Sequence, residues 1–345
     1  MEEVSAHAHL PHAFRDHPKD KVSFASVNLS DYLPDEQVQM RNSIVQSYVP
    51  QIAKNKEAIA SIESAIRAIP TRHFVVHGDA RLMHEVPTNS VHLVVTSPPY
   101  WSLKKYQDSD GQLGHIIDYE EFLHEINQVW QRCFDLLVPG GRLICVVGDV
   151  CLSRRQNEGR HTVVPLHASI QESCRRIGFD NLAPIIWHKI ANAAYEVSGS
   201  GGFLGKPYEP NSVIKNDIEY VLMQRKPGGY RKPETAARIL SVISADRYQQ
   251  WFQQIWSGIP GESTRHHPAP YPIELAERLI RMFSFVGDVI LDPFSGTGTT
   301  VLAAAKCARN SIGYEIDSRY LHASIERLAR ETGSLFHQPE IRELL

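Results

Sequence analysis

The chain has 345 residues, of which 42% are hydrophobic and 22% are charged, and its formal net charge is −3. This composition is typical of a globular protein with a sizeable core. It excludes a strongly basic chain, so any contact with nucleic acid would have to come from local basic surfaces. The five cysteines are scattered without a C-x-x-C pair, which argues against a disulfide framework or a zinc site and favours a reducing cytoplasm. No apolar run approaches the roughly 18 residues of a membrane span.

The N-terminal fifth of the chain differs from the rest in its pattern of polar and apolar residues. Residues 1–30 are polar and rich in His and Asp, and we expect them to be extended or disordered. Residues 31–68 repeat apolar side chains at three- and four-residue steps, which predicts helix. We expect Pro50 to divide this helix and Pro70 to end it. Residues 1–70 are therefore predicted to form a tail and a helical appendage.

From residue 72 onward, short β-branched runs alternate with helical patterns. Strands are expected at residues 73–79, 91–97, 142–149, 182–189, 217–226, 288–294 and 310–317. Helices are expected at residues 119–137, 162–178, 272–284, 299–308 and 318–331. This alternation predicts an α/β fold with a doubly wound, mostly parallel sheet. Two irregular stretches, residues 190–216 and 227–265, interrupt it and have the length of functional insertions.

The sequence VVTSPPYW, residues 94–101, ends a predicted buried strand with a rigid corner. Pro98 and Pro99 remove two backbone donors and hold φ near about −65°. A strand cannot continue through them. Two aromatic residues, Tyr100 and Trp101, follow directly. Taken alone, the stretch is equally consistent with a structural turn that carries a packed aromatic ring.

The sequence VILDPFSGTGTT, residues 289–300, places a glycine turn between a predicted strand and a predicted helix. Gly296 and Gly298 let a ligand approach the backbone closely, and the helix N-terminus beyond them favours negative charge. Glu315, at the end of the next strand, suits the two hydroxyls of a ribose. Val301 replaces the third glycine of the dinucleotide pattern, and the lysine of a P-loop is missing. The unit therefore favours a nucleoside without a polyphosphate.

The two motifs together resemble those of S-adenosylmethionine-dependent DNA amino-methyltransferases. The resemblance is to the permuted (beta) group, in which the target-base motif precedes the cofactor motif, and it spans residues 72–330. It implies a Rossmann-like methyltransferase fold, with residues 71–345 as the catalytic domain and with DNA-recognition insertions at 190–216 and 227–265. It also implies S-adenosylmethionine as cofactor without a metal, and double-stranded DNA as partner.

The chemistry explains why such a family would use the proline corner. The exocyclic amine of a base is a poor nucleophile, because its lone pair is delocalised into the ring. Rigid acceptors around the amine can hold its hydrogens and localise that lone pair. The hydroxyl of Ser97 and the carbonyl of Pro98 are suited to this, and Tyr100 offers a ring on which a flipped base can stack. The resemblance therefore implies these catalytic residues: Ser97, Pro98, Pro99 and Tyr100.

The remaining site residues follow from the same resemblance and from local charge. The residues expected to bind the cofactor are Asp79, Thr96, His267, Pro268, Ala269, Asp292, Phe294, Ser295, Gly296, Thr297, Gly298, Thr299, Glu315 and Ile316. Asp292 has a competing role, which is to order the glycine loop. The cations expected to contact DNA phosphates are Lys189, Lys206, Arg225, Lys226, Arg231 and Lys232.

The identity of the target base is left with two alternatives. Ser97 in the first position of the proline motif is typical of enzymes that methylate cytosine N4, whereas aspartate there is typical of adenine N6 enzymes. Tyr271 also favours cytosine N4, because the adenine enzymes usually carry a lysine at that position. Methylation of a protein amide or a small-molecule amine, and a DNA-binding protein without catalysis, are further alternatives. The resemblance leaves open whether a cognate restriction endonuclease accompanies the chain, and whether the chain is a monomer or a homodimer.

Overall fold

The structure is a computed structural model, and it describes most of the chain. The described residues are 15–16, 22–38, 45–101, 111–152, 154–155, 157–189, 210, 216–261, 271–332 and 340–344. In this part of the chain, no helix has both the length and the apolar content that crossing a bilayer would require.

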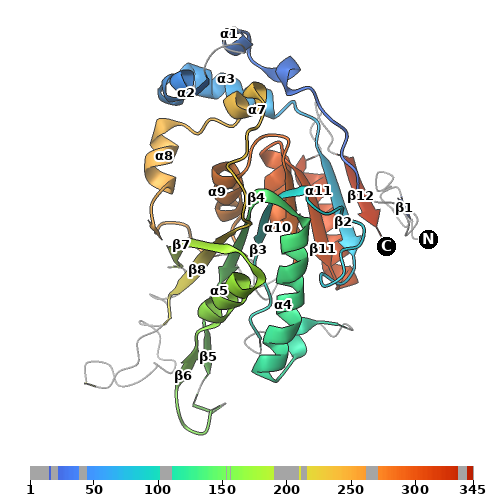
Figure 1. Cartoon of the computed structure of the whole chain (residues 1–345), viewed down its shortest axis with the longest axis vertical. Coiled ribbons are helices and arrows are strands. Elements are labelled where there is room, and N and C mark those ends of the chain that lie inside the picture. Colours follow the sequence, from blue (N-terminus) through green and yellow to red (C-terminus); the bar gives the residue numbers. More distant parts are fainter. Residues whose placement is uncertain are drawn as a thin grey trace, which may run out of the picture.

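A ten-stranded sheet forms the centre of the molecule (Figure 1). In spatial order its strands are β1 (Arg15–Asp16), β12 (Glu340–Leu344), β2 (Arg72–His77), β11 (Asn310–Glu315), β10 (Val289–Asp292), β3 (Val91–Thr96), β4 (Leu137–Val147), β8 (Ile218–Arg225), β7 (Asp180–His188) and β9 (Ile255–Trp256). Neighbouring strands are parallel except at the β4–β8 and β8–β7 pairs. The predicted α/β fold with a mostly parallel sheet is confirmed.

Helices cover both faces of the sheet. One face carries α4 (Tyr119–Leu136) and α5 (Leu166–Ile177), and the other carries α9 (Ile273–Phe283), α10 (Thr299–Lys306) and α11 (Ser318–Thr332). Successive side chains of a strand point to opposite faces. In β3, Val94 packs in the cluster with α4 and α5, while Leu93 and Val95 pack in the cluster with α9 and α10. Burial on both faces explains why these strands are uninterrupted apolar runs.

The N-terminal helices pack at one end of the sheet (Figure 1). They are η1 (Leu29–Tyr32), α1 (Asp35–Val38), α2 (Val45–Lys54) and α3 (Lys56–Ile66), of which η1, α2 and α3 share a hydrophobic cluster with α7 (Thr235–Leu240). The expected break at Pro50 is wrong, because Pro50 lies inside α2. The break falls at Asn55, whose side chain accepts a hydrogen bond of 2.9 Å from the Ala58 amide and caps α3.

The described part of residues 1–30 is extended and packed against the body of the protein. The Val22 amide donates to the Glu85 carbonyl at 3.0 Å, and the ring of Phe24 meets that of Phe74 edge-on at 5.3 Å. At the edge of the sheet, β1 pairs with β12, which was not predicted. The first and the last described strands therefore lie side by side at the same edge of the sheet.

Two further elements differ from the predictions. Residues 162–164 begin no helix; they form β6 (Thr162–Val164), which pairs with β5 (Val150–Leu152) in a hairpin. Pro165 favours extended backbone in the residue before it, so the helix starts only at Leu166. The stretch 138–141, expected as a turn, belongs to β4 and carries a register shift against β3. The insertion at 227–265 contains α7, α8 (Ala245–Trp251) and β9 in its described part, whereas residues 190–209 and 211–215 lie outside the described residues.

Candidate active site

The two motifs meet at one edge of the sheet. β3, which ends at Thr96, and β10, which ends at Asp292, are direct parallel neighbours, with Leu93 opposite Ile290. The chain leaves β10 towards β11 on one side, and it leaves β3 towards β4 on the other. Ligands of open α/β sheets bind at such a switch point, in the crevice beyond the carboxyl ends of the strands.

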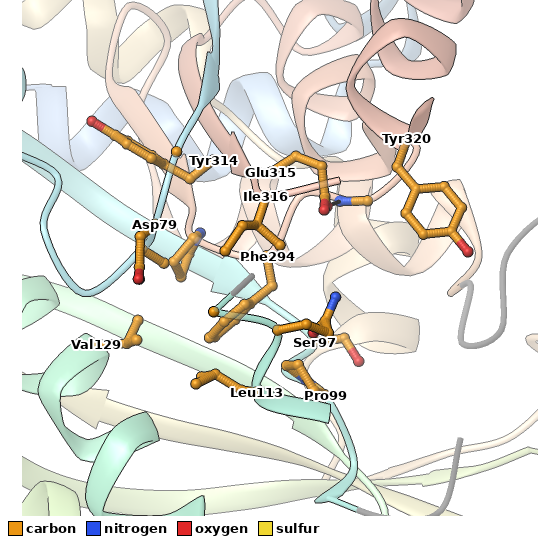
Figure 2. A pocket seen from close by; sticks show the side chains of 16 residues that line it. Asp79, Ser97, Pro99, Leu113, Val129, Phe294, Tyr314, Glu315, Ile316 and Tyr320 are labelled. Atoms are coloured by element: carbon orange, nitrogen blue, oxygen red, sulfur yellow. Dashed lines mark hydrogen bonds between the residues drawn. The ribbon is translucent and has the colours of Figure 1, made fainter. Parts of the chain in front are cut away.

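A cleft opens at this switch point (Figure 2). Its lining comes from the ends of β2, β3, β10 and β11, from α4 and α11, and from the segment at η4 (Leu113–His115). The lining residues are Gly78, Asp79, Ala80, Ser97, Pro99, Gly111, Gln112, Leu113, Val129, Pro293, Phe294, Gly296, Tyr314, Glu315, Ile316 and Tyr320. Figure 2 shows Phe294 between Ser97 on one side and Glu315 on the other.

The free space in the cleft is small. Its cavity volume is about 60 Å³, far less than the roughly 300–1,000 Å³ of typical ligand pockets. The segment before η4 closes one side, since a Cβ on Gly111 would lie 3.0 Å from Ile316 and 3.5 Å from Asp79. The free space between these walls is therefore narrow in this structure.

Asp292 lies beneath the cleft and joins its two motifs. One carboxylate oxygen accepts hydrogen bonds from the Thr96 hydroxyl at 2.7 Å and from the Phe294 amide at 3.0 Å. The other oxygen accepts from the Thr300 hydroxyl at 2.5 Å. Burial raises the pKa of Asp292 to about 6, although these hydrogen bonds act in the opposite direction. The carboxyl thus orders the strand ends and the glycine loop, which is the competing role named above.

Glu315 faces the cleft and also holds the glycine turn. Its side chain accepts hydrogen bonds from the Gly296 amide at 2.8 Å and from the Asp317 amide at 2.9 Å. Burial raises the pKa of Glu315 to about 7. A carboxylate has about four lone-pair sites, so two amides leave it able to accept further hydrogen bonds from hydroxyl groups of a ligand.

The turn itself requires glycine. Gly298, which precedes α10, has φ of +77°, and a Cβ there would lie 2.2 Å from the Ser324 hydroxyl. Gly296 has φ of +51°. This backbone brings the N-terminus of α10 under the cleft, where helix N–H groups are directed at the ligand side.

The proline corner contributes Ser97 and Pro99 to the lining, while Tyr100 turns inward. The hydroxyl groups of Ser97 and Tyr100 lie 3.2 Å apart. The ring of Tyr100 is buried in the core cluster rather than exposed in the cleft. In this conformation Tyr100 lies beside Ser97 with its ring buried, and its stacking on a base remains a prediction.

Asp79 forms the wall opposite the proline corner. Arg81 binds its carboxylate with both Nε and a terminal nitrogen, and the same guanidinium also contacts Glu125. Asp79 is therefore a positioned acceptor at the rim, with its charge already compensated.

The structure brings together part of the predicted cofactor set. Asp79, Phe294, Gly296, Glu315 and Ile316 line the cleft. The members of this set that do not line the cleft and lie in the loops and strand ends around it are Thr96, Asp292, Ser295, Thr297, Gly298 and Thr299, and the predicted catalytic residue Pro98 does not line it either. The expected contacts at His267, Pro268 and Ala269 lie outside the described residues.

Sequence reasoning missed several lining residues. Tyr314 and Tyr320 flank Glu315 in the chain, and the ring of Tyr314 forms one wall while its hydroxyl donates to Glu85 at 2.7 Å. Gln112 and Leu113 follow the proline motif by about a dozen residues, in a segment with no helical or strand pattern. Only the adjacency of Tyr314 to Glu315 was a usable signal in the sequence.

The predicted DNA-contacting cations divide between two edges of the sheet. Lys189 lies at the carboxyl end of β7, on the same edge as the cleft, where it pairs with Glu219 at 2.8 Å and lies over the ring of Trp187. Arg225 lies at the opposite edge, because it pairs with Arg142 near the start of β4. Lys206 lies outside the described residues.

The other cations of this group accompany Arg225. Lys226 donates to the Leu137 carbonyl at 2.8 Å, and Arg231 binds the buried carboxylate of Asp288. Lys232 follows directly in the chain. The sheet register places Arg225 at the edge opposite the cleft, and the DNA contacts of these four cations remain a prediction.

Comparison with known proteins places the chain in a family. A family model described as DNA methylase (N6_N4_Mtase) matches residues 91–326. The chain is 38% identical over 278 residues to the type II methyltransferase M.MjaI of Methanocaldococcus jannaschii, which covers 72% of this chain and 88% of that protein. It is 33% identical over 296 residues to the type II methyltransferase M.MthZI of Methanothermobacter thermautotrophicus, which covers 79% and 81%.

Comparison with solved structures supports the same family. A Thermus thermophilus protein assigned as a DNA modification methylase, crystallised with S-adenosyl-L-methionine, matches with a TM-score of 0.65 at 52% identity, covering 79% of this chain and 98% of that chain. The cytosine-N4-specific PvuII DNA methyltransferase matches with a TM-score of 0.55 at 17% identity, covering 80% of this chain and 96% of that chain, which shows a shared fold alone. The chain therefore belongs to the N6_N4_Mtase family of DNA methylases.

Proposed function

We propose that this chain is an S-adenosylmethionine-dependent DNA methyltransferase of the permuted group, and that it methylates the N4 amine of cytosine in a flipped-out base. One observation carries the proposal. Ser97 and Gly296, which follow the adjacent strands β3 and β10, line the same cleft. An amine held at the first and a methyl donor held at the second would therefore meet without any long-range movement of the fold.

The cofactor side of the cleft fits a nucleoside. Glu315 offers carboxylate oxygens to ribose hydroxyls, and Phe294 and Ile316 offer apolar surface to a purine. Asp79 lies at the rim, within reach of the charged amino group at the far end of the cofactor. When bound, S-adenosylmethionine supplies an electrophilic methyl group on a sulfonium. The roles of the other expected cofactor contacts, including Asp292 and Thr96, are then to shape the loops that carry these groups.

The amine side depends on Ser97. A hydroxyl has one hydrogen and two lone pairs. If the Ser97 hydroxyl donates to Tyr100, which lies 3.2 Å away, both lone pairs of Ser97 are left to accept from the target amine. Pro98 and Pro99 fix the backbone around this acceptor, so little reorganisation is needed when the amine begins to attack.

The choice of cytosine rests on Ser97. Tyr271, the second residue that favours cytosine, is buried beneath the cleft, and its hydroxyl contacts the Thr300 hydroxyl. It therefore acts on the site through α10 and not by touching the base. Adenine N6 remains the alternative with the same chemistry. Membership of the DNA methylase family favours either base over a protein amide or a small-molecule amine.

The test is to identify the modified base. The purified chain is incubated with duplex DNA and methyl-labelled S-adenosylmethionine, and the DNA is digested to nucleosides for mass spectrometry. We expect N4-methyldeoxycytidine with the wild type and a strong reduction of it with Ser97→Ala. N6-methyldeoxyadenosine as the sole product would replace cytosine by adenine, and the absence of any methylated nucleoside would overturn the proposal. Sequencing the methylated DNA of an expressing host would give the recognition sequence.

The substrate and the protein partners of the chain also follow from this proposal. Double-stranded DNA is the substrate, and Lys189, at the edge that carries the cleft, is the described cation placed to approach its phosphates. The similarity to two proteins named type II methyltransferases supports a role in restriction–modification. A cognate endonuclease, a cytoplasmic location, and a monomeric or homodimeric state are part of the proposal and are tested by genomic context, fractionation and light scattering.

A further inference from the structure

A second cavity, of about 740 Å³, lies at the edge of the sheet opposite the cleft. Its walls are α2, α7, the start of α8, the end of α9 and the residues around 229–231. It reaches the sheet at His92 and Arg142, near the starts of β3 and β4, whereas the cleft lies beyond the ends of those strands. Its volume is within the roughly 300–1,000 Å³ range of small-molecule sites.

The lining of this cavity is cationic although the whole chain has a net charge of −3. Among the described residues, the lining contains six Lys and Arg side chains and no Asp or Glu: Lys54, Arg142, Arg225, Arg231, Arg238 and Arg281. Three of these arginines pair with carboxylates that lie outside the lining, namely Asp180, Asp288 and Glu63. The carboxylates hold the arginines in place, and the cavity surface keeps an excess of positive charge.

Two of the arginines face each other without an acid between them. Arg142 in β4 and Arg225 in β8 are directly opposite in register. Like charges in such a cross-strand pair oppose each other, and both burial and Arg225 lower the pKa of Arg142. No carboxylate of the described residues lies within salt-bridge distance of Arg142, whose guanidinium lies 4.8 Å from the centre of the Phe283 ring. An anion bound between the two guanidinium groups would remove this repulsion.

Aromatic side chains accompany the cations. Tyr230 is 85% exposed and Tyr248 is 58% exposed, and both line the cavity. Phe285 lies 5.5 Å beneath the guanidinium of Arg231. Large exposed rings beside several guanidinium groups match a ligand that has both a flat ring and a phosphate, since rings stack on aromatic faces and guanidinium groups bind phosphate.

We propose that this cavity binds a free mononucleotide, with its phosphate groups between Arg142 and Arg225 and its base against Tyr230 or Tyr248. The cavity is enclosed by helices on several sides, which suits a small molecule better than a duplex. A duplex that presents a base to Ser97 lies at the other edge of the sheet, so the two sites serve different ligands. The inference is independent of which base the enzyme methylates.

The test is calorimetric titration of ADP into the full chain, with S-adenosylhomocysteine present in excess to occupy the cleft. We expect binding at one site. Arg142→Gln, which keeps a polar side chain at this position but removes the guanidinium over Phe283 and its charge, should weaken ADP binding at least tenfold. Tyr230→Ala, which removes an exposed ring, should weaken it several-fold. Arg175→Gln, an exposed arginine on α5 paired only with Glu172 among its described partners, is the matched control and should leave ADP binding unchanged.

The controls separate this site from its alternatives. Equal ADP affinity for the wild type and both cavity variants would overturn the proposal, as would equal affinity for inorganic phosphate and ADP, which would reduce the cavity to a simple anion site. Displacement of ADP by a short duplex at lower concentration than by AMP would assign the cavity to nucleic acid instead. Failure of S-adenosylhomocysteine to bind would count against the proposed function, while the comparison of wild type with Arg142→Gln would still decide this inference.

Discussion

Replacing Glu315 with glutamine isolates the contribution of one buried carboxylate to cofactor binding. In the ligand-free protein burial raises the pKa of this group to about 7, above its ordinary value of 4.5. In the proposed role, ribose hydroxyls donate to this carboxylate and favour its ionised form, so binding would require loss of the proton. Affinity in the wild type should therefore be full above pH 7 and should decrease as the pH falls below it.

The size of the effect follows from the position of that pKa. At pH 6 about one carboxyl in ten is ionised, so the Kd for S-adenosylhomocysteine should be about tenfold higher than at pH 8. Glutamine cannot ionise and loses a charge-assisted hydrogen bond worth about 2 kcal/mol, or about thirtyfold in Kd at pH 8. The Kd of the variant should be nearly independent of pH, and the two proteins should differ only a few-fold at pH 6.

Calorimetric titrations at pH 6, 7 and 8 measure this directly. Glu326→Gln, at an exposed position on α11, is the matched control and should follow the wild type. A wild-type Kd that does not change between pH 6 and 8 would refute the reasoning. An equal pH dependence in Glu315→Gln would assign the proton to another group.

Three further predictions concern catalysis and stability. Ser97→Ala should lower kcat by about 100-fold, by analogy with the loss of one preorganised hydrogen-bonding group, while the Kd for S-adenosylhomocysteine changes less than twofold; collapse of cofactor binding would contradict this division of roles. Asp292→Asn should flatten the pH dependence of the free energy of unfolding. Between about pH 4 and 6 the unfolded chain has lost a proton that the native Asp292 retains, so the stability of the wild type falls with rising pH by up to about 3 kcal/mol. Urea unfolding at several pH values would measure this difference. Gly298→Ala should lower the free energy of unfolding by about 3 kcal/mol through its left-handed backbone and the contact with Ser324, and adding Ser324→Ala should recover part of the loss; an unchanged melting temperature would mean that the loop relaxes freely.

Much of the architecture was readable in the sequence because local chemistry forces it. Uninterrupted apolar runs such as residues 91–96 belong to strands buried on both faces, and the helical periods between them require parallel connections. Proline and glycine then fix where the chain turns: Pro98 and Pro99 cannot continue a strand, and Gly298 has to adopt left-handed backbone. These constraints act within a few residues, so no tertiary information was needed.

The secondary-structure elements that the sequence predicted incorrectly are determined by contacts with residues far away in the chain. Residues 162–164 carry a pattern compatible with helix but pair with β5, and β1 exists only because β12, more than 300 residues later, lies beside it. Pro50 sits inside α2, where packing against α7 holds the helix. The cation cluster at 225–232 was assigned to DNA from its charge alone, and only the antiparallel pairing of β8 with β4 places Arg225 at the edge opposite the cleft.

The sequence by itself determined the α/β fold and the chemistry of the two motifs, since strand patterns, prolines, glycines and the spacing of Glu315 are local properties of the chain. Only the tertiary structure decided which side chains share the cleft. In the structure, Asp292 and Tyr100 lie beneath the cleft and do not line it, whereas Tyr314, Tyr320 and Leu113 form part of its wall. The physical reason is that lining a cavity depends on strand order, register and the direction of each side chain, and these are fixed by long-range packing that a linear pattern does not contain.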